Sequence, residues 1–504
     1  MTPRGQHAPA TFDAAPQPAD RALRGLPPWT YGELLVLIAL LLVGGGLRLT
    51  RLSVPAGVMF DETYYAKDAC LYASSGGPKG ATGGQERCGL NQATEQSWVH
   101  PEVGKWLIAA GIKIFGYREF GWRVSAALFG TLMIPLVFLL ARVLFRDRTT
   151  AGLAGLLIAA DPLMIVQSRI AMLDIFLAFF VVAGFVFLAF DRDRLLRARD
   201  ALSSGVRLPR RYGWRLAAGA ALGLAVSTKW SAAWGLAGAA LLATTWSITF
   251  VGSAARARRV AAPPAEEAAD GAGDAEGDDD GERPRSRGTS AVGSVAVKEL
   301  VSLIAAFVLV PLAVYLLGYA PWFGEHHLDL SAFADLHRRM LNYHLTLKAT
   351  HSYQSRAWTW PLILRPVAYY WKSSPLATHI DAIGNPATWW AALMAVPWLL
   401  ARSARRWAPQ RLVVAGWASQ FLPWLIVARP LFFFYMTPVV PFMMLGLASG
   451  LRSLAGRSRG WRALVVAFVV LGVGVMVVWL YPIIAAVGLP IEQWRSRMLL
   501  RTWI

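Results

Sequence analysis

Residues 149–190 read TTAGLAGLLIAADPLMIVQSRIAMLDIFLAFFVVAGFVFLAF. The stretch holds two apolar runs, 149–167 and 170–190, joined by a turn of a few residues. A helix needs ~20 apolar residues to cross the hydrocarbon core of a bilayer. Each run is therefore long enough to span a membrane, and the short turn makes the two helices antiparallel neighbours.

Apolar runs of this kind recur along the whole 504-residue chain, of which 55% is hydrophobic and 16% charged. Soluble domains carry ~25% charged residues, so an ordinary soluble enzyme, a small disulfide scaffold and a disordered hub are excluded. We predict an all-α polytopic membrane protein. Its eleven expected spans are 32–48, 122–145, 149–167, 170–190, 214–228, 230–251, 299–321, 387–401, 410–428, 431–450 and 461–481.

The formal net charge is +19, which in a soluble protein would suggest nucleic acid. Here the basic residues lie in short loops between spans, as at 191–213, 402–409 and 451–460. Cytoplasmic loops are enriched in Lys and Arg, so we place the N-terminus in the cytoplasm and the C-terminus outside, and expect no nucleic-acid partner.

This orientation divides the chain into four parts and puts two long loops on the outer face. The outer loops are 49–121 and 322–386. The predicted parts are a disordered cytoplasmic tail (1–31), a module of six spans (32–251), a disordered acidic cytoplasmic linker (252–298) and a module of five spans (299–504).

Two adjacent carboxylates, Asp61 and Glu62, lie about a dozen residues after the first span. Acidic groups beside the bilayer edge are costly unless they are paired or used. Desolvation and like charge would raise the pKa of at least one of them, and such a carboxylate can accept a proton from a hydroxyl. The alternative is a solvated pair in a loop.

Other charged groups converge on the same outer edge. Asp174 lies just inside the apolar zone near the outer turn between spans 149–167 and 170–190, with Arg169, five residues earlier, as its expected partner. Arg123 lies at the outer end of a span and Lys229 at an outer turn between spans. His100 and Lys105 could face a phosphate or a sugar, although an interfacial helix with a snorkelling lysine also explains them.

The second outer loop mixes aromatic, hydroxyl and arginine side chains, which suits a phosphate with a sugar attached but also an interfacial aromatic belt. Candidate residues there and at the nearby span end are His351, Tyr353, Gln354, Ser355, Arg356, Arg365 and Arg429. No phosphate-binding Walker loop, zinc-ligand spacing or GxSxG motif is present, and we assign no metal site.

The two cysteines, Cys70 and Cys88, both fall in the first outer loop. That side of the membrane is oxidising, so we favour a disulfide over two separate thiols.

Taken together, these motifs resemble the bacterial, actinobacterial-type protein O-mannosyltransferases over nearly all of residues 30–504. Residues 100–105, His-Pro-Glu-Val-Gly-Lys, are similar to the family's His-Pro-Pro-Leu-Gly-Lys motif, with Glu102 and Val103 as departures. The other matching stretches are Phe-Asp-Glu at 60–62, Ser-Arg…Leu-Asp at 168–174, Thr-Lys-Trp at 228–230 and His-Ser-Tyr-Gln-Ser at 351–355.

The resemblance implies a C-type glycosyltransferase fold in the plasma membrane and polyprenyl-phosphate-mannose as donor. Expected acceptors are Ser or Thr hydroxyls of polypeptides emerging outside, delivered at the secretion translocon; membrane lipids are further partners. No cofactor is obligatory, and metal dependence stays open. Asp61 would be the general base of an inverting transfer, with Glu62 orienting the acceptor or sugar.

For the donor phosphate we expect contacts from Lys105, Arg123 and Arg169, held in place by His100 and Asp174. The candidate residues of the second outer loop and Arg429 would line the donor site. The lipid tail would lie in an apolar groove between spans.

Two other functions compete with this one. A related lipid-linked transferase could act on a glycolipid or a cell-wall polysaccharide, because one fold hosts several acceptors. A transporter would instead place charges near the bilayer midplane on repeated, broken helices, and neither feature is apparent here.

Overall fold

A computed structural model describes residues 26–75, 88, 98–203, 212–260 and 285–504. The N-terminal tail (1–25) and residues 261–284 of the predicted linker lie outside these ranges.

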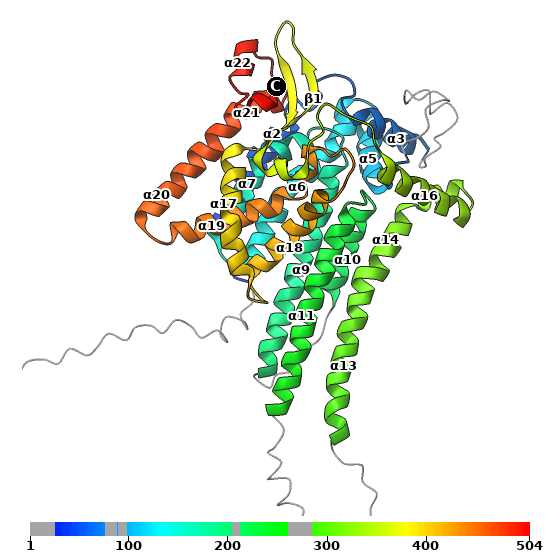
Figure 1. Cartoon of the computed structure of the whole chain (residues 1–504), viewed down its shortest axis with the longest axis vertical. Coiled ribbons are helices and arrows are strands. Elements are labelled where there is room, and N and C mark those ends of the chain that lie inside the picture. Colours follow the sequence, from blue (N-terminus) through cyan, green and yellow to red (C-terminus); the bar gives the residue numbers. More distant parts are fainter. Residues whose placement is uncertain (1–25, 76–87, 89–97, 204–211, 261–284) are drawn as a thin grey trace, which may run out of the picture.

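The described chain is a helical bundle with both long loops folded over one end (Figure 1). Its first module comprises α2 (Tyr31–Leu49), α3 (Glu62–Ser75), α5 (Val103–Phe115), α6 (Glu119–Phe145), α7 (Arg148–Ala159), α8 (Pro162–Gln167), α9 (Asp174–Ser203), α10 (Gly213–Val226) and α11 (Ala232–Val260).

The second module begins with α13 (Arg285–Ile304), the π-helical turn η1 (Ala305–Leu309), α14 (Val310–Gly318), α15 (Ala320–Glu325), α16 (Leu330–Thr346), the 3-10 turn η2 (Ala357–Leu362), β1 (Val367–Lys372) and β2 (Thr378–Ala382). It continues with α17 (Pro386–Ser403), α18 (Pro409–Phe421), η3 (Leu422–Leu425), η4 (Phe433–Met436), α19 (Val440–Ala455), α20 (Arg459–Ala467), the π-helical segment η5 (Phe468–Val475), α21 (Met476–Ile484), α22 (Ile491–Arg495) and η6 (Arg501–Trp503).

The polytopic helical fold is confirmed. Within the described residues, six helices are long and apolar enough to cross a membrane, and three shorter apolar helices accompany them. The count of eleven spans stays a prediction. The helical bundle buries a continuous apolar core to which both modules contribute, from Ile134 and Phe176 in the first to Trp389 and Phe442 in the second.

Several predicted spans have different limits in the structure, and two of them are broken or shortened by a turn. The run 149–167 is broken between α7 and α8, because Asp161 caps α8 by accepting a hydrogen bond from the backbone N–H of Met164 at 3.0 Å. Asp161 also accepts a 2.8 Å bond from the indole of Trp389. The run 431–450 becomes helix α19 only at Val440, after the 3-10 turn η4.

One element departs from the all-α prediction. Strands β1 and β2 form an antiparallel hairpin in which Val367 pairs with Ala382 and Lys372 with Thr378, with a register irregularity between Ala368 and Tyr370. The hairpin lies over the loop end of the bundle (Figure 1).

The predicted linker 252–298 is wrong at both of its ends. Helix α11 continues to Val260 and α13 begins at Arg285, so the spans extend beyond their apolar runs. A buried ion-pair network ties this region together: Arg215 of α10 binds Asp191 of α9 and Glu299 of α13, each at 2.9 Å. Helix α11 ends and α13 begins at the side of the molecule away from the hairpin (Figure 1).

Candidate active site at the loop end

Asp61 lies at the N-terminus of α3, in the loop that follows α2. The preceding residue, Phe60, has a positive φ of 49°, which turns the chain sharply into the helix. Asp61 as a residue is intermediate in exposure, and its carboxylate forms no hydrogen bond or ion pair with the described residues. The protein around the carboxylate removes water from it and so raises the pKa of Asp61 to about 6; Lys229 lowers the pKa and Asp174 raises it.

Glu62 has the opposite environment, because its carboxylate is fully buried and fully bonded. Arg123 of α6 binds both its oxygens, at 2.8 and 2.9 Å, and the backbone N–H groups of Met59 and Ala171 donate to it at 3.1 and 3.0 Å. Glu62 therefore anchors the start of α3 to α6 and to the turn between α8 and α9. It positions its neighbour Asp61 and has no free oxygen for an acceptor or a sugar.

Arg123 cannot contact a donor phosphate, contrary to our prediction. Its guanidinium carries five N–H donors, and all five are used: two on Glu62 and three on the carbonyls of Leu52, Pro55 and Gly57. The side chain is fully buried. Its role is to hold the first outer loop against α6.

Arg169 also holds internal backbone, while its buried Nε has no hydrogen-bond partner among the described residues. It is 2% exposed and donates to the carbonyls that end α2, those of Leu47, Arg48, Thr50 and Arg51. The predicted Arg169–Asp174 pair is wrong for this reason.

Lys105 in α5 is also enclosed, so its predicted contact with a phosphate is wrong too. Its ammonium lies 3.1 Å from Glu102 and 3.5 Å from Asp68, with no exposed surface. Burial lowers the pKa of Lys105, but the attraction of Glu102 and Asp68 outweighs it and the pKa lies above its ordinary value. Glu102, which departs from the family motif, is thus one of the two acids that neutralise this lysine, and the nearer one.

The partner of Asp174 is Lys229, from the turn between α10 and α11. The ammonium donates to both Asp174 oxygens, at 3.0 and 3.1 Å. It also lies 4.7 Å from the ring centroid of Tyr435, a residue of the second module. Asp174 therefore fixes a cation, as predicted, but that cation is Lys229.

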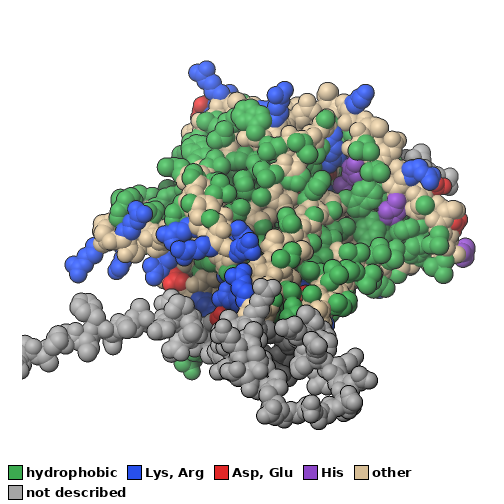
Figure 2. Space-filling model, turned by 60° about the horizontal axis from the view of Figure 1, so that its bottom comes forward, with side chains coloured by type: hydrophobic (Ala, Val, Ile, Leu, Met, Phe, Trp, Pro, Cys, Tyr) green, Lys and Arg blue, Asp and Glu red, His purple; other side chains and the backbone are tan. Residues whose placement is uncertain are grey.

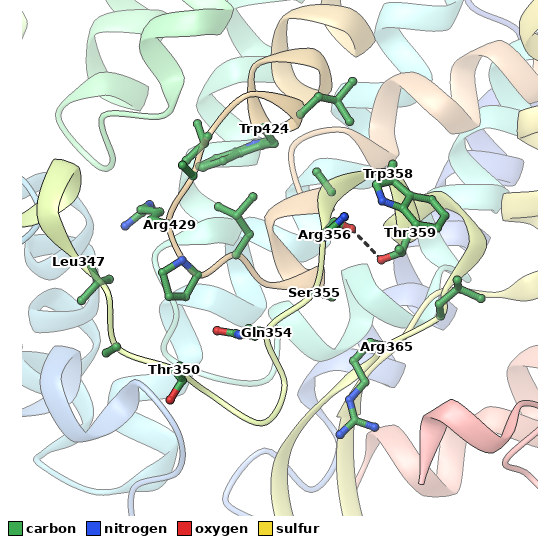
Figure 3. Close-up of a pocket in the computed structure, with 18 of the residues that line it drawn as sticks. Leu347, Thr350, Gln354, Ser355, Arg356, Trp358, Thr359, Arg365, Trp424 and Arg429 are labelled. Atoms are coloured by element: carbon green, nitrogen blue, oxygen red, sulfur yellow. Dashed lines mark hydrogen bonds between the residues drawn. The ribbon is translucent and has the colours of Figure 1, made fainter.

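A cavity of about 1120 Å³ opens at the same end of the molecule (Figure 3). Its walls come from the segments after α16, from η2 and from residues 424–431 and 501–504. Four arginines and a lysine line it without any Asp or Glu side chain: Arg356, Arg365, Arg429, Arg501 and Lys348. The rest of its lining mixes polar residues, such as Gln354 and Ser355, with an apolar wall that includes Leu347, Trp424, Leu425, Val427 and Leu431.

Arg429 connects this cavity with the Asp61 region. One of its terminal nitrogens donates to Nδ1 of His344 at 3.1 Å, and its guanidinium lies 5.9 Å from the Tyr435 ring centroid. Tyr435 in turn contacts Lys229. Arg429 is thus the lining arginine that reaches toward the two first-module charges Lys229 and Asp174, and toward Asp61, whose pKa they influence.

His344 holds Arg429 in this position. Burial, followed by repulsion from Arg429, lowers the pKa of His344 to about 4, so its ring is neutral near pH 7. A neutral ring that accepts at Nδ1 must carry its proton at Nε2, and Nε2 lies 3.0 Å from the carbonyl of Val99. His100 stacks on this ring at 5.4 Å, and burial also lowers the pKa of His100 well below its ordinary value.

The other predicted residues of the second outer loop divide into two groups. Gln354, Ser355, Arg356 and Arg365 line the cavity. His351 and Tyr353 do not: the His351 ring accepts from the backbone N–H of Tyr353 at 3.1 Å and packs on Phe432. Arg365 donates to the carbonyls of Thr502 and Ile504, at 2.9 and 3.3 Å, and so joins the loop to the end of the chain.

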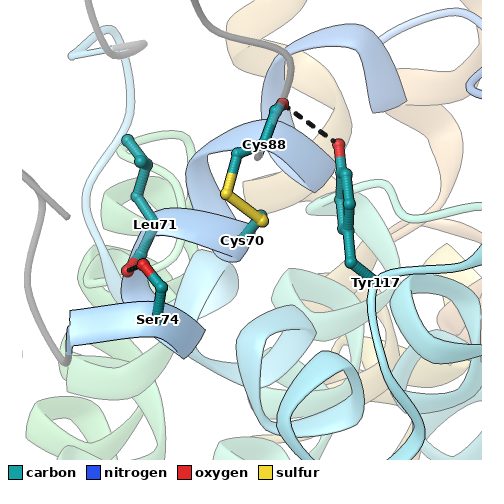
Figure 4. Close-up of a disulfide and its surroundings, with 5 residues drawn as sticks. All are labelled: Cys70, Leu71, Ser74, Cys88 and Tyr117. Carbon is teal, nitrogen blue, oxygen red and sulfur yellow. Dashed lines mark hydrogen bonds between the residues drawn. A yellow bond between two sulfur atoms is a disulfide. The ribbon is translucent and has the colours of Figure 1, made fainter. Parts of the chain in front are cut away.

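The predicted disulfide between Cys70 and Cys88 is present and buried (Figure 4). The hydroxyl of Tyr117, just before α6, donates to the carbonyl of Cys88 at 3.4 Å. The disulfide thereby ties the middle of the first outer loop to α3, the helix that directly follows Asp61.

Several residues of the candidate site were not identified from the sequence. His344 and Tyr435 position Arg429 and Lys229, and an aromatic group of Phe60, Tyr369 and Phe434 lies beside Asp61, with Phe60 4.5 Å from Tyr369. The sequence signal for them was weak, since each is an aromatic ring or histidine in an outer loop rich in both. Among the described residues, no group of three or more His, Cys, Asp or Glu could hold a metal ion.

Comparison with known proteins gives a consistent result over the chain. A family model described as dolichyl-phosphate-mannose-protein mannosyltransferase matches residues 38–325, and one for the C-terminal four-span region of protein-O-mannosyltransferase matches residues 329–503.

Two curated relatives are called polyprenol-phosphate-mannose–protein mannosyltransferase. The one from Mycobacterium tuberculosis is 32% identical over 96% of this chain and 93% of its own length. The one from Corynebacterium glutamicum is 28% identical over 72% of each chain. Among solved structures, an S. cerevisiae protein O-mannosyltransferase complex bound to the sugar donor matches with a TM-score of 0.71 and 13% identity, over 96% of this chain and 94% of that one.

Proposed function

The chain belongs to the dolichyl-phosphate-mannose-protein mannosyltransferase family, and from this premise we propose that it transfers mannose from polyprenyl-phosphate-mannose to Ser or Thr hydroxyls of proteins. We place the reaction at the loop end of the bundle, facing the outside of the plasma membrane. The expected acceptors are secreted or membrane polypeptides.

The observation that carries this proposal is the contrast between Asp61 and its neighbours. Glu62, Asp68, Glu102 and Asp174 are all paired with buried cations. Asp61 alone among these five keeps its carboxylate free of ion pairs with the described residues. A free carboxylate with a pKa of about 6 is ionised at neutral pH and still basic enough to accept a proton.

The cavity has a basic part and an apolar part, and these match the phosphate and the lipid tail of the donor. Its phosphate would lie against Arg429, with Arg356 and Arg365 contributing positive charge at the rim. The first isoprene units would lie along the apolar wall near Trp424 and Leu431. The sugar would then extend past Tyr435 toward Asp61.

The transfer is a single displacement at the anomeric carbon. The acceptor hydroxyl oxygen forms the new C1–O bond while the bond from C1 to the phosphate oxygen breaks, and that electron pair leaves with polyprenyl phosphate. Asp61 takes the hydroxyl proton as the oxygen attacks. Attack opposite to the leaving phosphate inverts the anomeric centre, and Arg429 stabilises the charge of the departing phosphate.

The test uses purified full-length protein, polyprenyl-phosphate-mannose with labelled mannose, and a Ser/Thr-rich peptide. We expect labelled peptide with the wild type and a loss of about 10²–10⁴-fold with Asp61→Asn, the range for removing a general base. The matched control is Asp335→Asn, which makes the same change on the exposed face of α16.

Two results would contradict the proposal in different ways. Near-normal transfer by Asp61→Asn would remove Asp61 from the mechanism. Label that moves to a glycolipid or polysaccharide, and not to the peptide, would leave the fold intact but give the chain the other acceptor class.

A further inference from the structure

The final long helical segment, Arg459–Ile484, stands apart from the rest of the bundle along its first half (Figure 1). Only 22% of its apolar window is buried inside the molecule. Val466, Val470 and Leu471 are 57%, 57% and 61% exposed. This part of the segment therefore presents an apolar surface with no protein packed on it among the described residues.

Two hollows flank this segment near its start. One, of about 470 Å³, lies between the segment and helices α7 and α19, with Leu153 and Ala455 on its far wall. The other, of about 620 Å³, lies on a neighbouring face of α20 and η5. Both hollows are lined by Arg462, Val466 and Val470. The two valines form a ridge between the hollows, called the valine ridge below, and Arg462 is a cation that both hollows share.

Positive charge gathers at the mouth of these hollows. Arg459 lines one, Arg452 the other and Arg462 both. In the described part of the chain no carboxylate pairs with Arg459 or Arg462, while Arg452 binds Asp147 at 3.1 Å through Nε and stays 43% exposed. Figure 2 shows Lys and Arg side chains grouped beside hydrophobic ones on this side of the molecule.

We propose that this place is a binding site for an anionic phospholipid. Its phosphate lies between Arg459 and Arg462, with Arg452 behind them, and its two acyl chains lie along the valine ridge, one in each hollow. Basic clusters next to spans attract anionic headgroups, and an apolar wall without protein cover suits acyl chains.

This lipid is distinct from the donor. The segment of 26 residues is ~39 Å long at 1.5 Å per residue, and its far end leads to Ala486, whose backbone N–H bonds the hairpin at His379. Arg459 thus lies at the end of the span away from the hairpin and the donor cavity. A polyprenyl phosphate bound there could not bring its sugar to Asp61.

The experiment measures lipid binding to purified full-length protein by native mass spectrometry. The probes are phosphatidylglycerol, phosphatidylcholine with the same acyl chains, and glycerol 3-phosphate. The variant is Arg459→Gln/Arg462→Gln. The control is Arg405→Gln/Arg406→Gln, which removes the same charge from the loop between α17 and α18, outside both hollows.

We expect the wild type to retain phosphatidylglycerol, and the Arg459→Gln/Arg462→Gln variant to bind it roughly 30-fold more weakly, with the control unchanged. Equal binding of phosphatidylglycerol by all three proteins would overturn the site. Equal retention of phosphatidylcholine would overturn the role of the arginines, and equal retention of glycerol 3-phosphate would overturn the role of the acyl chains. A melting curve of each variant verifies that it is folded.

Discussion

At the scale of single residues, the candidate site depends on the different hydrogen-bond partners of two adjacent carboxylates, Asp61 and Glu62. Glu62 is bound by Arg123 and two backbone N–H groups, whereas Asp61 has no such partner among the described residues. The anchor that immobilises Glu62 also fixes the turn at Phe60, so Asp61, the proposed general base, is held by its neighbour and not by bonds of its own. This arrangement keeps Asp61 free to accept a proton.

The raised pKa of Asp61 predicts an acid limit for the reaction. Because the pKa is about 6, the ionised fraction, and with it the transfer rate, should fall tenfold for each pH unit below about 6. Initial rates of peptide mannosylation between pH 4.5 and 8 test this, with melting temperatures recorded at each pH as the control for unfolding. A flat profile down to pH 5 would contradict it.

The same shift gives a stability prediction for Asp61→Asn. Folding raises the pKa of Asp61 above its unfolded value, so the folded state disfavours the ionised form, and the penalty applies once the pH exceeds the unfolded pKa. Asparagine removes this penalty. At pH 7 the variant should therefore melt at the wild-type temperature or above it while inactive, and a clearly lower melting temperature would argue for a structural role.

Glu62→Gln should act through stability. It leaves the fully buried Arg123 without its counter-charge, a change that costs about 3–5 kcal/mol. We expect a lower melting temperature, measured by thermal unfolding in detergent. The control is Glu492→Gln, whose pair with Arg495 is exposed on both sides and which should change stability by at most ~1 kcal/mol. Equal melting temperatures for both variants would refute the anchoring role.

At the scale of elements, the disulfide predicts how firmly α3 is held. The bond closes a loop of 18 residues, which corresponds to about 3 kcal/mol in the chain-entropy model. Cys70→Ser/Cys88→Ser should therefore melt at a lower temperature than wild type, and a reducing agent should lower the wild-type melting temperature toward that of the variant. No change in either case would mean that the contact of Tyr117 with Cys88 suffices.

The sequence predicted the membrane-spanning helices better than it predicted which side chains pair with each other. Long apolar runs identified α2, α6, α9 and α11 because a bilayer imposes a length and a polarity on each span. The break before α8 had a readable signal, since Asp161-Pro162 is a helix start within an apolar run. The hairpin had none, because its strands are short and mix aromatic, charged and small residues.

Side-chain partners were harder to predict, as Asp174 illustrates. Arg169 is five positions before it, yet Asp174 pairs with Lys229, 55 positions later. Which cation reaches an acid depends on how spans pack, and a sequence shows only which charges share one edge of the membrane. The charges therefore converge as predicted, while Arg123 and Lys105 are taken up by internal partners and Arg169 holds the backbone at the end of α2.

At the scale of the whole molecule, the loop distribution predicts an orientation. Residues of α16 should be outside the cell and the loop after α17 inside, because the latter carries the arginines. Single cysteines at Asp335 and Ser403 test this with a membrane-impermeant maleimide on intact cells, since the two natural cysteines are bonded to each other. We expect labelling at position 335 only; labelling at 403 only would reverse the orientation.

The ion-pair network at Arg215 has a consequence for how the two modules recognise each other. Asp191 and Arg215 belong to the first module and Glu299 to the second, and at the opposite end Lys229 meets Tyr435 across the same boundary. The two modules are therefore joined by ion pairs at one end of their boundary and by a cation–ring contact at the other. Two co-expressed polypeptides, 1–260 and 285–504, should find each other in the bilayer and reconstitute the transferase, as a split protein does, with neither fragment active by itself.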